Sequence, residues 1–174
     1  MATAKQVVEI CERILMLPSG SVTANTDKLR AAGVLSANQA EPTQATPQEA
    51  ALILLTAIVG TPMRHQPTIA TAYADLEDGG VRLGDRLAAI LAGTSDSFVV
   101  SLEVDLSAPA ATLLVATGPY GLPEHYRTTD AWPRPAFERT ATIRGELLRR
   151  IAHEIKTAPP VKKGRRKAQD RWKT

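Results

Sequence analysis

Basic side chains gather at one end of this sequence. Residues 156–174 contain eight Lys and Arg side chains and a single Asp. Basic groups at this density neutralise the phosphates of a nucleic acid, and an aromatic ring among them can stack on a base. We therefore expect nucleic-acid contacts from this segment, made by Lys162, Lys163, Arg165, Arg166, Lys167, Arg171 and Trp172. The alternatives are a solvated tail that only aids solubility, or a docking peptide for an acidic protein partner.

The charge of the remaining chain differs in sign from that of the basic segment. The other 155 residues carry 13 Lys and Arg against 17 Asp and Glu, although the whole chain has a formal net charge of +3. A mildly acidic body with a strongly basic tail favours a polyanion or an acidic partner that contacts the tail. It does not favour a DNA-binding body that is basic throughout.

A second stretch, SVTANTDKLRAAGVLS at residues 21–36, combines apolar anchors with short polar side chains. Val22 and Leu29 are seven residues apart and lie on one face of a helix after two turns. Hydroxyl and amide groups on the opposite face can contact phosphates and base edges. The candidate DNA contacts of this helix are Ser21, Thr23, Asn25, Thr26, Lys28 and Arg30.

This stretch, with its V…L…GVL spacing, resembles the reading helix of bacterial winged-helix regulators. Together with TPQEAALILLTAIVG at residues 46–60 it is similar to small N-terminal helix-turn-helix proteins of phages and prophages. Small terminase-like subunits, which initiate DNA packaging, are one subset of these. The resemblance covers about residues 5–60 and implies a helix that enters the major groove. The alternative is a helical hairpin that packs as core or as a subunit interface.

Residues able to perform catalysis are present but are not arranged for it. The spacing of His65, His125 and His153 makes no metal site, and Glu124 beside His125 has no nucleophile placed with it. Cys11 is the only cysteine, which excludes an internal disulfide and a cysteine-based zinc site. Its place on an apolar helix face predicts a buried thiol. We therefore expect no enzyme, no metal and no cofactor.

Hydrophobic periodicity predicts the elements that position these residues. A spacing of three and four residues indicates helices at 3–16, 21–33, 67–77, 82–92 and 144–155. The helix expected at 47–59 is apolar on nearly every side, which is typical of a central helix or a subunit interface. Thr46, Pro47 and Glu49 supply its capping box.

The period changes to two after Gly93, which indicates strands. The first strand is expected to turn one face inward, formed by Phe98, Val100, Leu102, Val104 and Leu106. Residues 111–117 return as the second strand of a hairpin, and residues 136–143 supply a third. Four prolines within residues 118–135 predict a loop between them.

These elements predict an α+β fold with three parts. Residues 1–60 form a helix-turn-helix-like module, residues 61–157 add helices and a small antiparallel sheet with a closing helix, and residues 158–174 form a disordered basic tail. No apolar run approaches the roughly 18 residues of a membrane span, and no secretory signal is visible. We therefore expect a cytoplasmic location.

The leading hypothesis is a non-enzymatic DNA-binding protein of phage or prophage type, homo-oligomeric, serving regulation or packaging initiation. Its helix-turn-helix reads the site and its basic tail adds phosphate contacts. The alternative is a protein–protein adaptor or assembly protein. In that case the helix at 47–59 and the sheet edge bind protein, and the tail docks on an acidic partner.

Overall fold

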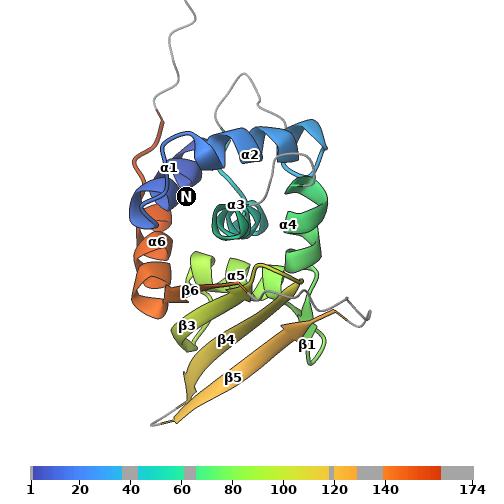
Figure 1. Cartoon of the computed structure of the whole chain (residues 1–174). Coiled ribbons are helices and arrows are strands. Elements are labelled where there is room, and N and C mark those ends of the chain that lie inside the picture. The colour runs from blue at the N-terminus through green and yellow to red at the C-terminus, as the bar shows by residue number, and fades with distance from the viewer. Residues whose placement is uncertain (1, 37–42, 61–65, 118–119, 129–138, 162–174) are drawn as a thin grey trace, which may run out of the picture.

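The computed structural model describes residues 2–36, 43–60, 66–117, 120–128 and 139–161. It confirms the α+β class, with helices packed on one antiparallel sheet (Figure 1). The helices are α1 (Ala4–Ile14), α2 (Ser21–Ala31), α3 (Pro47–Val59), α4 (Gln66–Ala74), α5 (Leu83–Ala92) and α6 (Gly145–Thr157). The strands are β1 (Glu77–Asp78), β2 (Val81–Arg82), β3 (Phe98–Asp105), β4 (Ala110–Thr117), β5 (Tyr120–Arg127) and β6 (Thr140–Arg144).

Helix α3 lies at the centre of the helical part, seen end-on in Figure 1 with the other helices around it. Its capping box is formed as expected: the Thr46 hydroxyl accepts from the Glu49 N–H at 3.1 Å, and the Glu49 carboxylate accepts from the Thr46 N–H at 2.8 Å. Leu54 and Leu55 are fully buried. Because neighbours within the same chain cover its apolar sides, α3 is a central helix.

The first residues of the chain tie three elements together. The Ala2 N–H donates to the Ile155 carbonyl of α6 at 2.9 Å, and the Ala2 carbonyl accepts from the Ala45 N–H at 2.9 Å. Thr3 then caps α1 in a capping box with Gln6. Buried side chains from residues 1–60 and 61–157 form one hydrophobic cluster, so the two segments share a core.

The sheet has the strand order β2-β1-β5-β4-β3-β6, and every neighbouring pair is antiparallel. Leu102, Leu113 and Tyr126 alternate inward and are buried on the face that the helices cover. The opposite face carries Glu103 and His125, which are exposed. One face of the sheet therefore belongs to the core, and the other is turned away from the helices.

Strand β5 corrects the loop expected at residues 118–135. Tyr120–Arg127 pairs along its whole length with β4. Pro123 is compatible with this strand because the other side of β5 is paired to β1 at only one position, Glu77↔Arg127, within the described residues. A proline, which lacks an N–H, is accepted in a strand where that N–H would have no partner.

Other boundaries also differ from expectation. Helix α4 ends at Ala74 instead of 77, and the short strands β1 and β2 fill the connection to α5. The third expected strand, β6, begins at Thr140, and residues 136–138 lie outside the described residues. The hairpin of β3 and β4 and the closing helix α6 are confirmed.

The inward face expected for β3 is wrong at its start. The register against β4 shifts between Val99 and Ser101, which marks a β-bulge. An extra residue reverses which side chains point inward, so Val99 is buried whereas Phe98 is 55% exposed and Val100 is 40% exposed. A Cβ on Gly145 would lie 1.9 Å from the Val99 carbonyl oxygen, so the first residue of α6 must be small to pack on this bulge.

The bulge yields a stability test. Leu102→Asp would bury an unpaired carboxylate at a position with no exposed surface and should destabilise the fold by more than about 3 kcal/mol. Val100→Asp places its charge in solvent and should cost less than about 1 kcal/mol. Urea unfolding of the two variants measures both costs, and equal losses would contradict the bulge.

Candidate nucleic-acid interface

Helix α2 packs with Val22 and Leu29 buried, as expected. Thr26, however, is fully buried, and its hydroxyl donates to the Val22 carbonyl at 2.7 Å. This bond satisfies the hydroxyl inside the helix, so Thr26 acts as a third anchor. The expectation that Thr26 faces DNA is therefore wrong.

The N-terminal end of α2 is occupied by an acidic side chain. The Glu12 carboxylate of α1 accepts from the N–H groups of Val22 and Thr23, at 2.9 and 3.3 Å. A carboxylate at this place is favourable because it meets the positive end of the helix dipole. The same N–H groups are those that would otherwise receive a phosphate. In this structure a phosphate would meet the Glu12 carboxylate there.

The outward face of α2 carries little positive charge. Arg30 donates to Asp27 at 2.7 Å, and its side chain is only 14% exposed. Lys28 is exposed, and so is Asp27 beside it. Of the other candidates, Thr23 is exposed and Ser21 and Asn25 are partly exposed. DNA contacts by Ser21, Thr23, Asn25, Lys28 and Arg30 stay a prediction.

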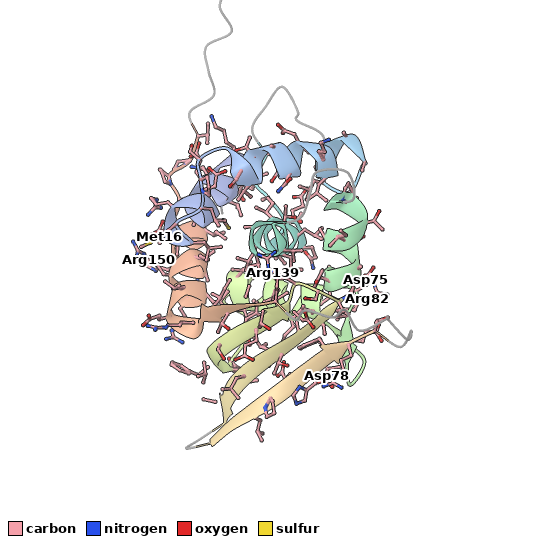
Figure 2. All side chains as sticks on the ribbon, in the orientation of Figure 1. Met16, Asp75, Asp78, Arg82, Arg139 and Arg150 are labelled. Atoms are coloured by element: carbon pink, nitrogen blue, oxygen red, sulfur yellow. The ribbon has the colours of Figure 1, made fainter. Side chains whose placement is uncertain are left out.

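Helix α6 presents a stronger basic face, which we call the α6 stripe and define as Arg149, Arg150, His153 and Lys156. All four are exposed, and spacings of three and four residues place them on one side of a helix. Figure 2 shows Arg150 pointing away from the core. The buried side of the helix is formed by Leu148, Ile151 and Ile155. The stripe therefore faces away from the core.

The α6 stripe leads directly into the basic segment, and its setting includes two acidic residues. Glu154 accepts from Arg150, and Glu146 lies 4.0 Å from Arg144 at the start of the helix. Lys156 extends toward Gly93, the residue that ends α5. A helix C-terminus favours a cation there because its carbonyls are partly negative.

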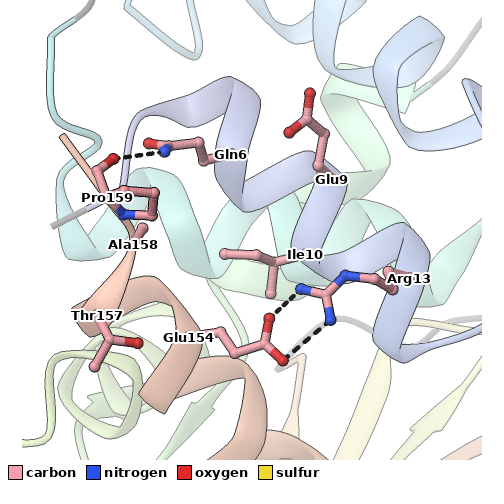
Figure 3. A pocket seen from close by; sticks show the side chains of 8 residues that line it. All are labelled: Gln6, Glu9, Ile10, Arg13, Glu154, Thr157, Ala158 and Pro159. Atoms are coloured by element: carbon pink, nitrogen blue, oxygen red, sulfur yellow. Dashed lines mark hydrogen bonds and ion pairs between the residues drawn. The ribbon is translucent and has the colours of Figure 1, made fainter. Parts of the chain in front are cut away.

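The point where the basic segment leaves the body is fixed by contacts with α1 (Figure 3). The Gln6 amide donates to the Pro159 carbonyl at 2.9 Å, and Arg13 forms a two-bond ion pair with Glu154. The hydrogen bonds of this pair raise the pKa of Arg13 and lower the pKa of Glu154. Between them is a cavity of about 340 Å³, lined by Gln6, Glu9, Ile10, Arg13, Glu154, Thr157, Ala158 and Pro159.

None of the predicted tail contacts lies within the described residues. Lys162, Lys163, Arg165, Arg166, Lys167, Arg171 and Trp172 lie outside the described residues, which end at Val161. Sequence reasoning also missed the α6 stripe, although its spacing is visible in RRIAHEIK. Hydrophobic periodicity predicts the helix but does not use the cations on its other side.

A cluster of hydrogen-bonded polar side chains joins α5 to β5. The Glu124 carboxylate accepts from Arg86 at 2.6 and 3.1 Å and from the Tyr126 hydroxyl at 2.8 Å. Burial and the bond to Glu124 raise the pKa of Tyr126 above its usual range. Arg86 also donates to Ser95 and Ser97. Every member is paired, so the cluster fastens α5 to the sheet.

The described ranges contain neither a metal-binding cluster nor a helix that could span a membrane. Within them, no three His, Cys, Asp or Glu side chains are grouped so that they could hold a metal ion. His125 is exposed and contacts the Thr112 hydroxyl at 3.3 Å on the sheet face turned away from the helices. Among the described helices, none has the length and apolarity needed to span a bilayer.

Comparison with known proteins adds no relative to these observations. No family model matches the sequence, and no curated protein or solved structure matches it. The resemblance to phage helix-turn-helix proteins therefore stays a hypothesis drawn from the residues of this chain.

The single thiol gives a test of the helical core. Cys11 is buried, and burial, followed by the charge of Glu12, raises its pKa to about 12. Because the thiolate is the reactive form, labelling at pH 8 should be at least about 100-fold slower in the native protein than in guanidinium. Absorbance of a chromogenic disulfide reagent measures both rates. Fast native labelling would contradict the packing of α1.

Proposed function

We propose that this chain binds DNA without catalysing a reaction, and that most of its affinity comes from phosphate contacts at its C-terminal end. The observation that carries the proposal is the continuity of charge between the α6 stripe and the basic segment. Four exposed side chains on one side of α6 precede seven further Lys and Arg in residues 162–174. Such a track is complementary to a polyanion.

The contacts that hold Glu154 and Pro159 against α1 support this arrangement. Gln6 and Glu154 hold the end of α6 against α1, so the stripe and the start of the segment keep one relative position. DNA lying along α6 would reach Pro159, after which the basic residues 162–174 follow in the sequence. Fixed charges add to affinity because less freedom is lost when they bind.

Helix α2 has a smaller role in this proposal than the resemblance implies. Its N-terminus is capped by Glu12, and its surface mixes Lys28 with Asp27. Base contacts from Thr23 and Asn25 would then add sequence preference to an affinity supplied elsewhere. The DNA sequence that the protein prefers would distinguish a role in regulation from a role in packaging initiation.

The alternative is an adaptor whose basic segment docks on an acidic protein. The sheet face turned away from the helices favours it, because no element of the described ranges covers that face and an open face offers a flat contact surface. Helix α3 cannot serve such an adaptor as a binding helix, since its apolar sides are buried within one chain. Its burial also removes the main reason to expect self-association through α3.

Deletion of residues 162–174 tests the role of the basic segment while keeping the Gln6–Pro159 bond. Seven Lys and Arg are lost, so affinity should fall on every DNA sequence. The slope of log affinity against log salt should become shallower by about 4–6 units. Anisotropy titrations over a salt series measure both, with Asp170→Asn as the control that keeps all basic residues. An unchanged slope would favour the adaptor.

A second comparison separates α6 from α2. Arg150→Gln with Lys156→Gln should weaken binding to all duplexes and reduce the salt slope by about two units. Thr23→Ala with Asn25→Ala should cost about 1–3 kcal/mol only on a preferred duplex selected from a random pool, with the slope unchanged. Lys5→Gln, an exposed lysine on α1, is the matched control. If only the α2 pair matters, α2 is the reading helix and α6 is scaffold.

A further inference from the structure

An exposed aromatic ring lies at the beginning of the α6 stripe. Phe98 is the first residue of β3 and is 55% exposed. The Arg149 guanidinium carbon lies 4.1 Å from the centre of its ring. A guanidinium over a ring face is attracted by the ring electrons, so the two side chains form one composite surface.

The backbone holds this surface in place. Arg149 donates to the Val99 carbonyl at 2.9 Å, and Gly145 packs against the same carbonyl. Pairing between β3 and β6 stops at Ser101↔Arg144, so Phe98 lies beyond the last pair. The bulge thus turns Phe98 out of the core. It stays fixed relative to α6.

The ring lies at one end of the open sheet face, with Ala116 as its strand partner and Arg149 as the cation against it. Arg144, Arg149 and Arg150 are the basic residues at this end of α6, and Asp96 and Glu146 are the acidic ones. Farther along the helix Lys156 adds a cation before the basic segment, and Glu154 is the acidic residue between Arg150 and Lys156. Grooves that bind single-stranded nucleic acid combine aromatic rings with cations that follow the phosphates, and Phe98 with Arg149, Arg150 and Lys156 offers this combination.

We propose that Phe98 and Arg149 form a stacking platform for an unpaired base, so that the chain takes single-stranded DNA along α6. One base stacks on the open part of the Phe98 ring while the neighbouring phosphates meet Arg150 and Lys156. Bases in an intact duplex are already stacked on each other and do not reach such a platform. This inference rests on the proposed function, because it names the form of DNA that the same surface takes.

The test compares the full chain and its variants on a labelled oligothymidine strand and on a duplex of mixed sequence, by fluorescence anisotropy at one salt concentration. Phe98→Ala should weaken single-strand binding about 5- to 150-fold, the range expected for one stacked base. Duplex binding should stay unchanged, and so should the salt slope, because no charge is lost. Phe98→Trp keeps an aromatic face at this position and should bind the single strand about as tightly as the parent chain.

Leu122→Ala is the matched control, because Leu122 is a large apolar residue on β5 that is 58% exposed, close to the 55% of Phe98. It should leave both titrations unchanged. Phe98→Leu keeps an apolar side chain without a π face, so it should also lose single-strand binding while its melting temperature stays near that of the parent chain. Single-strand binding retained by Phe98→Leu would overturn the platform.

The outcomes also separate this inference from the proposed function. If the unmodified chain binds neither DNA form, the proposed function fails, and the platform fails with it. If the chain binds both forms and the Phe98 variants match it on both, the platform is wrong and the proposed function stands. Equal weakening on strand and duplex would likewise overturn it, because stacking requires an unpaired base.

Discussion

The burial of α3 is the constraint on which this fold depends. A helix with apolar residues on nearly every side is stable only when neighbours cover it all round. Helices α1, α2, α4 and α5 pack against it, and α6 packs on α1 and α5. The sheet then covers the remaining side of α5 and α6. Since these layers belong to one core, an element cannot move far without exposing apolar surface.

This packing decides which charged surfaces are available. Glu12 accepts a hydrogen bond at the start of helix α2, and the Thr26 hydroxyl donates one within it. These polar groups of α2 are therefore already bonded inside the protein. Helix α6 instead uses its apolar side for the core and leaves its cations outside. The difference is one of exposure: Arg30 is bound by Asp27 with 14% of its side chain exposed, whereas Arg150, although paired with Glu154, is 60% exposed.

The sequence allowed the long helices to be predicted because their caps and periodicity act locally. Thr46 and Glu49 mark the start of α3 by chemistry that does not depend on the rest of the fold. Thr26 was misjudged because a threonine can satisfy its own hydroxyl and so become an anchor. The inward position predicted for Phe98 and Val100 is wrong because alternation contains no sign of a bulge, and Gly145, which packs against this bulge, is far along the chain. A loop was predicted in place of β5 because the sequence does not show which side of Pro123 has a strand partner.

The open edges of the sheet are short or interrupted, and this bears on how the protein behaves when concentrated. Strand β2 has two residues and β6 has five, ending at Arg144, and the longer open side of β5 contains Pro123, which has no N–H to offer. An edge strand exposes N–H and C=O groups to which another sheet can add, and short or charged edges offer few of them. The chain can therefore present one face of its sheet to solvent with little tendency toward edge-to-edge aggregation.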